Sequence, residues 1–224
     1  MRIGIVASAG GAAFTKAVEL LSLVGINHEF HVVTDRPCDM ENRCKELGLN
    51  WKRVAQDDNR EFSTETAGWL FEKNQVDWVC FFLSRLVTKE IFDRGTCVNI
   101  HPSLLPSFPG MGAVRRAWES GVSFIGASAH YVDQSIDGGK LIGQVIAPLD
   151  GSRGLQEVNH LSFAQKVYLM LLLTELSMQG VITRGIDVRD SYDKMVYTNP
   201  SLQNDDLLNA FKSFLLKNEI KWTI

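Results

Sequence analysis

Hydrophobic and polar positions follow two alternating patterns along the first half of the chain. Four apolar runs have the length and the β-branched or aromatic content of strands: residues 3–7, 29–33, 76–83 and 96–100. Amphipathic segments with helical spacing lie between or next to them: residues 12–24, 39–47, 62–71 and 88–92. This β-α-β-α order predicts an α/β fold with a Rossmann-like, doubly wound and mostly parallel sheet.

The pattern changes in the second half. Residues 123–132 and 140–147 are strand candidates joined through the turn at 137–139, so we expect an antiparallel addition to the sheet. A long helix is predicted over Leu155–Met178. We assign residues 1–185 to the main domain and residues 186–224 to a C-terminal appendage with an amphipathic helix over Asn204–Lys217. Its apolar stripe is expected to dock on the body, and a partner or dimer contact is the alternative.

Composition narrows the function classes. The net charge of −3 argues against a dedicated nucleic-acid surface, and no apolar run reaches the roughly 20 residues of a membrane span. The chain opens directly into a strand-like run without a signal peptide, so we expect a cytoplasmic protein. The four cysteines show neither a CxxC pair nor zinc spacing, so we expect structural thiols and no metal. The sequence does not decide whether the protein forms a homodimer.

Candidate chemistry centres on Asn99, His101 and Asp137. Alternate residues of a strand share a face, so Asn99 and His101 point the same way at the carboxyl end of a predicted strand, where open α/β sheets bind ligands. Pro102 stops the ladder after them. An amide donor can stabilise an oxyanion, an imidazole can donate or relay a proton, and a carboxylate can accept one. Together they suit acyl transfer to an amine without a covalent enzyme intermediate.

Each of these features also has a structural interpretation. An Asn-x-His pair on a strand is more often hydrogen-bonded for structure, and Asp-Gly-Gly alone is a turn signal. Ser103 follows the histidine but lacks the G-x-S-x-G elbow of a nucleophile. His130 is either a core histidine or part of the site lining, and spacing does not decide between them.

The motifs taken in order resemble those of the folate-dependent formyltransferases, and specifically the glycinamide ribonucleotide transformylase branch. The resemblance rests on the run from Asn99 to Pro106, on Pro109-Gly110, and on residues 126–132 leading to Asp137-Gly138-Gly139. It implies a Rossmann-like formyltransferase domain that uses 10-formyltetrahydrofolate. It also implies catalytic roles for Asn99, His101 and Asp137, with His130 lining the site.

The resemblance further implies two binding regions. The folate is expected in a groove formed by the loop after Gly110, the region 133–139 that begins with Asp133, and a short segment: Ser84, Arg85, Leu86 and Val87. The amine acceptor is expected near the first βα loop and the long helix, at these further positions: Gly10, Gly11, Ala12 and Lys166.

Two departures from that branch bear on the acceptor. The first loop reads Gly10-Gly11-Ala12-Ala13, so the hydroxyl and amide that hold the substrate phosphate in the branch are absent, although a helix N-terminus still offers N–H groups. Lys166 stands where the branch has a glutamate that contacts the acceptor amine. We therefore expect the primary amine of another small molecule, an amino sugar nucleotide, with phosphoribosylglycinamide formyltransferase of purine biosynthesis as the alternative.

The sequence gives less support to three other functions. Hydrolysis of formyl-folate is typical of chains with an additional N-terminal regulatory domain, whereas this chain begins at its first strand. A catalytically silent folate- or nucleotide-binding module does not explain three intact catalytic positions. A dinucleotide oxidoreductase needs a G-x-G-x-x-G turn, and Ser8-Ala9-Gly10-Gly11 lacks that spacing.

Overall fold

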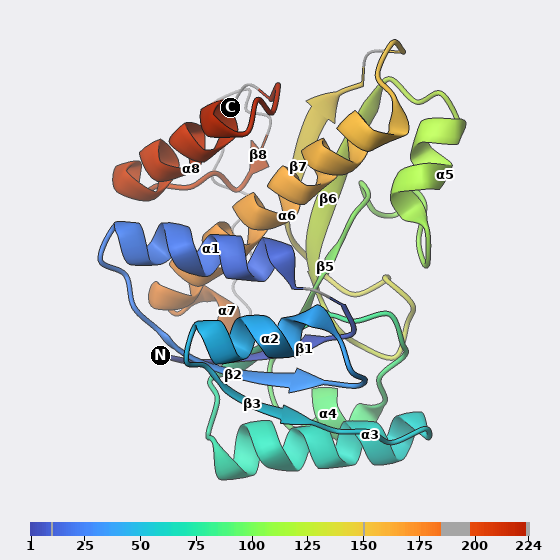
Figure 1. Ribbon diagram of the computed structural model, residues 1–224. Coiled ribbons are helices and arrows are strands. Elements are labelled where there is room, and N and C mark those ends of the chain that lie inside the picture. The colour runs from blue at the N-terminus through green and yellow to red at the C-terminus, as the bar shows by residue number, and fades with distance from the viewer. Residues whose placement is uncertain (10, 150, 185–197, 223–224) are drawn as a thin grey trace.

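A mixed sheet of eight strands forms the centre of the protein, as the computed structural model shows (Figure 1). The structure describes residues 1–9, 11–149, 151–184 and 198–222. The strands are β1 Arg2–Ala7, β2 Glu29–Thr34, β3 Asn50–Arg53, β4 Trp78–Phe82, β5 Cys97–His101, β6 Phe124–Tyr131, β7 Leu141–Pro148 and β8 Thr198–Asn199. Their order in the sheet is β3-β2-β1-β4-β5-β6-β7-β8. Strands β1 to β5 pair in parallel, and β6, β7 and β8 are added antiparallel, so the predicted fold class is confirmed.

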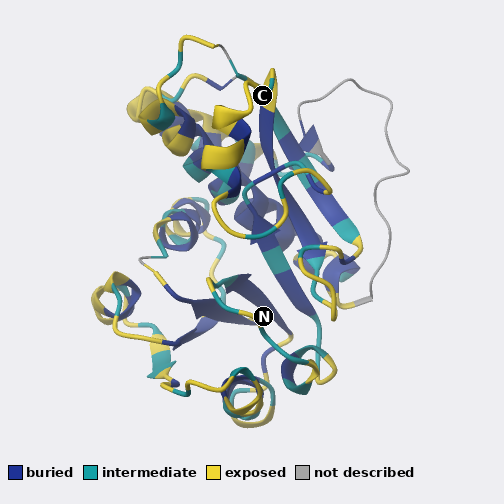
Figure 2. Cartoon of the chain, turned by 90° about the vertical axis from the view of Figure 1, so that its right-hand side faces the viewer, coloured by how far each residue is buried: buried dark blue, intermediate teal, exposed yellow. Residues whose placement is uncertain are grey.

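Helices cover both faces of this sheet (Figure 1). They are α1 Ala12–Leu23, α2 Asp39–Glu46, α3 Asn59–Ala67, the π-helical η1 Gly68–Lys73, α4 Lys89–Phe92, α5 Ala113–Glu119, α6 Leu155–Met178, α7 Val181–Arg184 and α8 Asp205–Lys217. Figure 2 shows that the sheet is largely buried, while the outer faces of the helices carry most of the exposed residues. Burial on both faces is why the parallel strands read as continuous apolar runs.

Neighbouring strand residues contribute to two separate hydrophobic clusters. Ile5 of β1 belongs to a large cluster that also takes in residues of α1, α2, α6 and α8. Val6, the next residue, belongs to a smaller cluster with Phe62 of α3, Leu70 of η1 and Ile91 of α4. The alternation follows the two-residue period of a strand and fixes the register of β1 between two layers of helices.

Several elements differ from the sequence prediction. The edge strand β3 and the short helix α5 were not predicted, because β3 has no buried residue and α5 buries only Ala113 and Ala117. Helix α3 begins at Asn59 rather than at Phe62. The reason is the N-cap Asp58, whose carboxylate accepts hydrogen bonds from the backbone N–H groups of Arg60 and Glu61.

The described part of the C-terminal appendage packs on the body. Phe211 of α8 is fully buried, and its ring lies 5.3 Å from that of Tyr168 on α6 and 5.8 Å from that of Trp222. Strand β8 extends the sheet by pairing with β7. The docking prediction is therefore confirmed, while the predicted domain boundary at residues 185 and 186 falls outside the described residues. Among the helices that the structure describes, none has the length and apolar character to cross a membrane.

Candidate active site

Asn99 and His101 lie at the carboxyl end of β5, where the sheet changes from parallel to antiparallel pairing. On β6, His130 pairs with Asn99 and Ser128 pairs with His101. Directly paired residues of an antiparallel ladder share a face of the sheet. Four polar side chains are therefore gathered on one face of the sheet, near the carboxyl end of β5, and parallel α/β folds bind ligands at this end of their strands.

Asp137 reaches this face from the loop between β6 and β7 and connects the other side chains. Its Oδ1 accepts a hydrogen bond from Asn99 Nδ2 at 3.2 Å and lies 3.6 Å from His130 Nε2. Its Oδ2 lies 3.2 Å from His101 Nδ1 and accepts from the backbone N–H of Gly110 at 2.7 Å. The structure thus brings together Asn99, His101 and Asp137, the three predicted catalytic residues, and His130 belongs to the same cluster.

The turn that presents Asp137 depends on close backbone approach. Asp137 itself has a φ of 51°, in the left-handed region that few L residues adopt. A Cβ added to Gly139 would lie 1.8 Å from the carbonyl oxygen of Tyr131. The second glycine of the Asp-Gly-Gly motif is thus required by contact between the loop and the end of β6.

The surroundings of Asp137 favour its ionised form. Its carboxylate is 13% exposed. The interaction with His130, the N–H of Gly110 and the charges of His101 and His130 together lower the pKa of Asp137 to about 2, although burial acts in the opposite direction. Asp137 is therefore a carboxylate at neutral pH, able to orient an imidazole.

The hydrogen-bond partners of the two imidazoles assign their protons. His101 Nε2 lies 2.9 Å from the carbonyl oxygen of Phe108, which can only accept, so Nε2 carries a proton. His130 Nδ1 likewise lies 2.9 Å from the carbonyl oxygen of Tyr131 and donates to it. His130 Nε2 lies 3.2 Å from Asn99 Nδ2. While His130 is neutral, the two amide protons of Asn99 are directed at His130 Nε2 and Asp137 Oδ1, and an oxyanion bound here would compete with these two acceptors; once His130 is protonated, its Nε2 donates toward Asp137 instead.

A second network, which the sequence prediction missed, holds the loop after β5. Ser128 is fully buried, and its hydroxyl donates to Ser103 O at 2.7 Å and accepts from the N–H of Leu105 at 3.0 Å. Gln144 Nε2 donates to Ser128 Oγ at 2.9 Å and to Leu105 O at 3.0 Å. The two-residue period of β6 could have pointed to Ser128, which lies on the same face as His130, whereas Gln144 is brought there by the β6–β7 register.

The residues expected to bind the folate differ in their surroundings. The N–H of Ser84 donates to Ser8 Oγ, and Val87 packs on the smaller hydrophobic cluster. The guanidinium of Arg85 is engaged by Asn59, by the carbonyl groups of residues 56 and 57, and by the ring of Phe62. Arg85 therefore ties this segment to residues 56–59, and most of its donors are already engaged.

Exposed apolar side chains lie on the three segments expected to form the folate groove. The exposed fractions are 56% for Leu86, 74% for Met111 and 62% for Ile136. Met111 follows Gly110 and Ile136 precedes Asp137, so both flank groups of the polar cluster. Asp133 is exposed, and its carboxylate accepts hydrogen bonds from the N–H and hydroxyl of Ser135, which lower its pKa. Asp133 is committed to its own turn.

The expected acceptor-binding residues lie at the start of α1 and on α6. Gly11 caps α1 with a φ of 60° and no side-chain hydrogen bond, and Ala12 is its exposed first residue. No acidic residue occupies the first turn, so no side-chain carboxylate neutralises the positive end of the α1 dipole. Lys166 is half-buried on α6, and burial lowers its pKa. Gly10 lies outside the described residues.

Known proteins resemble this chain in sequence and in fold. The family model described as formyl transferase matches residues 1–167. Over 64 residues the chain is 44% identical to the phosphoribosylglycinamide formyltransferase of Bacillus subtilis, covering 29% of this chain and 33% of that protein. Over 116 residues it is 32% identical to a formyltetrahydrofolate deformylase of Synechocystis, covering 50% of this chain and 40% of that protein. The matched segments thus span less than half of these relatives' own lengths.

A solved structure extends the likeness over most of the fold. Glycinamide ribonucleotide transformylase 1 from Symbiobacterium toebii aligns with a TM-score of 0.73 and 27% identity, covering 80% of this chain and 88% of that one. The family model covers more than half of the chain and includes β1 to β7, and hence Asn99, His101, His130 and Asp137. The chain belongs to the formyl transferase family.

Proposed function

We propose that this protein transfers a formyl group from 10-formyltetrahydrofolate to the primary amine of a small molecule. The observation that carries the proposal is the single carboxylate, Asp137, linked to Asn99, His101 and His130 at the end of β5. The cluster contains acid, base and amide donor groups but no nucleophile, which suits direct attack of the amine on the formyl carbon. Family membership supports the same reaction and the folate donor.

In this mechanism the amine attacks the formyl carbon and forms a tetrahedral intermediate, whose oxygen takes up negative charge. The cluster's donors for that oxygen are His101 Nε2–H, which donates to the Phe108 carbonyl in the free protein and must leave it, and the amide protons of Asn99. The proton lost by the amine passes toward the Asp137 carboxylate, directly or through water, and the folate nitrogen leaves with a proton. Asn99 must release one of its two internal hydrogen bonds for this step.

The acceptor that we propose is an amino sugar carried on a nucleotide. Two features support this choice. Ala12 and Ala13 offer a phosphate their backbone N–H groups at the start of α1 but no hydroxyl or amide side chain. In the part of the chain that the structure describes, the Lys166 ammonium has neither an ion pair nor a hydrogen bond, and its burial disfavours the charge. An anionic carrier would supply the missing partner, whereas the amine alone would be repelled.

The alternative acceptor is glycinamide ribonucleotide. It is favoured by the named relatives, because both the Bacillus protein and the solved Symbiobacterium structure bear that activity in their names. The open N-terminus of α1 would also accept the phosphate of this acceptor through backbone groups.

An assay with three arms separates these proposals. Purified protein and 10-formyltetrahydrofolate are incubated with a panel of nucleotide-linked amino sugars, with glycinamide ribonucleotide, or without any amine. We expect tetrahydrofolate and a formylated amino sugar, both identified by mass spectrometry. Turnover of glycinamide ribonucleotide at ordinary enzyme rates, with none for the amino sugars, would establish the alternative. Formate released equally without amine would instead indicate a hydrolase, the activity named for the Synechocystis relative.

A further inference from the structure

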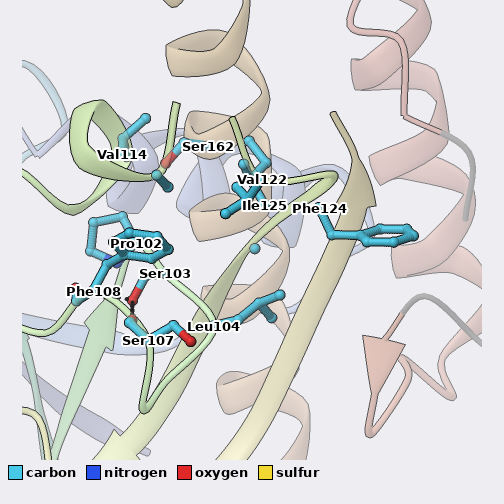
Figure 3. Close-up of a pocket in the computed structure, with 12 residues that line it drawn as sticks. Pro102, Ser103, Leu104, Ser107, Phe108, Val114, Val122, Phe124, Ile125 and Ser162 are labelled. Atoms are coloured by element: carbon cyan, nitrogen blue, oxygen red, sulfur yellow. Dashed lines mark hydrogen bonds between the residues drawn. The ribbon is translucent and has the colours of Figure 1, made fainter. Parts of the chain in front are cut away.

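A small cavity adjoins the loop that follows β5 (Figure 3). Its volume is about 100 Å³, and its walls come from this loop, from α5, from the first residues of β6 and from α6. The lining is mainly hydrocarbon, including Leu104, Phe108, Val114, Val122 and Ile125, and none of the described residues that line it is charged. None of the proposed catalytic side chains lines it, so the cavity is a space separate from the polar cluster.

One polar group in this lining lacks a partner. Ser162 of α6 is 2% exposed, and among the residues that the structure describes its hydroxyl has no hydrogen-bond partner. Ser103 also lines the cavity, but its hydroxyl donates to Ser107 O at 2.6 Å, the bond drawn in Figure 3. A buried hydroxyl without a partner costs free energy, so its presence in a cavity wall points to a group that binds there.

Other buried hydroxyl groups of the same helix show how unusual Ser162 is. Thr174 Oγ1 donates to Met170 O at 2.8 Å, and Ser177 Oγ donates to Thr174 O at 2.9 Å. These are the backbone bonds that helical serine and threonine ordinarily make. Gln165, three residues after Ser162, also leaves its Oε1 without a partner. Ser162 lines the cavity, and Gln165 Nε2 lies 3.4 Å from Ile125 O of β6, so this turn of α6 holds two unpaired polar atoms against β6.

The cavity is coupled to the polar cluster through one residue. The Phe108 side chain forms part of its wall, while the Phe108 carbonyl oxygen accepts from His101 Nε2 at 2.9 Å. Phe108 has a φ of 53°, a strained value for an aromatic residue. Phe108 therefore links the cavity wall to the carbonyl oxygen that holds the His101 imidazole.

We propose that this cavity binds a small neutral group, mostly hydrocarbon with one hydrogen-bonding atom directed at Ser162 Oγ, and that Phe108 transmits its occupancy to His101. A charged group is excluded because the lining offers no counter-charge. The size of the ligand follows from the volume. An engineered apolar cavity of about 150 Å³ in another protein holds benzene, so a group of about four or five carbon atoms fits here.

Isobutanol is a probe of this size and polarity, and methyl resonances report on its binding. The full chain with 13C-labelled methyl groups is titrated with isobutanol while the signals of Leu104, Val114, Val122 and Ile125 are followed. We expect saturable shifts at these methyl groups and a parallel shift of the His101 ring signals. Ser162→Ala should weaken binding about 3- to 10-fold by removing one hydrogen bond.

Matched variants test the assignment. Ser177→Ala removes a buried hydroxyl from the same helix but outside the cavity, so it should leave isobutanol binding unchanged. Ala117→Leu fills the cavity and should abolish binding, with Ala117→Val as the milder replacement if the leucine variant does not fold. A wild-type protein without saturable shifts, or equal binding by the filled variant, would overturn the proposal. If Ser162 instead binds an ordered water, the wild-type protein would show no saturable shifts.

The natural source of the group is either an apolar substituent of the amine acceptor or a free effector, and kinetics separate the two. A substituent predicts that isobutanol raises KM for the acceptor at constant kcat, whereas an effector predicts a change in kcat. The first source rests on the proposed function. The binding titration does not, because it needs no formyl transfer, so the two proposals can fail separately.

Discussion

At the scale of single residues, Asp137 accounts for most of the organisation of the site. One oxygen faces Asn99 and His130, and the other faces His101 and the N–H of Gly110. A neutral amide at this position could accept from Gly110 but would carry no charge for the imidazoles. The effect of the charge can therefore be separated from the effect of the shape.

Asp137→Asn makes that separation. We expect formyl transfer to fall by about 10²- to 10⁴-fold, because the group that orients His101 and accepts the amine proton is lost. Folate binding, measured by isothermal titration calorimetry, should change little because the side chain keeps its shape. Full activity in the variant would remove Asp137 from the mechanism, whichever amine is the acceptor.

The lowered pKa of Asp137 also predicts how stability depends on pH. Its folded pKa of about 2 lies below the ordinary value of 3.8, so the folded state favours the charged form. The resulting stabilisation, about 2 kcal/mol, is complete above pH ~4 and is lost as the pH falls toward 2. Urea unfolding of wild type and Asp137→Asn across this range should show a difference that shrinks on acidification. A difference that stays constant with pH would contradict the assignment.

Lys166 predicts a dependence of stability on pH with the opposite sign. Burial lowers its pKa below 10.5, so the charged ammonium destabilises the free protein. Lys166→Met should raise the free energy of unfolding at neutral pH, and the gain should shrink as the pH rises toward 10.5, where the wild-type ammonium is neutral too. With an anionic acceptor we expect KM to rise roughly tenfold at similar kcat, since one charge-assisted contact is lost. An unchanged KM would show that Lys166 does not bind the acceptor.

At the scale of elements, turns and strand register bring the site together. The sequence placed Asn99 and His101 on one face because a strand has a period of two, and that placement needed no tertiary information. It also located α6 at Leu155–Met178, since a long apolar pattern ends near Gly180. Ser128 lies on the face of β6 that the same period marks, but Gln144 could not be found in this way, because its contact with Leu105 depends on the pairing of β6 with β7.

Gly139→Ala tests the contribution of the turn itself. The added Cβ would lie 1.8 Å from the carbonyl oxygen of Tyr131, so the loop must move and carry Asp137 with it. We expect a loss of about 1–3 kcal/mol in unfolding free energy together with a lower kcat. Gly151→Ala is the control, because its added Cβ meets no atom within 4 Å. A Gly139→Ala variant with wild-type kcat would show that the position of Asp137 tolerates this shift.

At the scale of the whole molecule, α8 and the sheet share one hydrophobic cluster that runs through α6. Fully buried Phe211 contacts the rings of Tyr168, Phe214 and Trp222, so Phe211→Ala should lower the unfolding free energy by about 3–5 kcal/mol. Urea unfolding followed by circular dichroism and tryptophan fluorescence should show one shared transition at lower urea. Leu216→Ala, at a site 81% exposed, should change it by less than about 0.5 kcal/mol. Two separate transitions, with only one sensitive to Phe211, would mean that the appendage folds independently of the sheet.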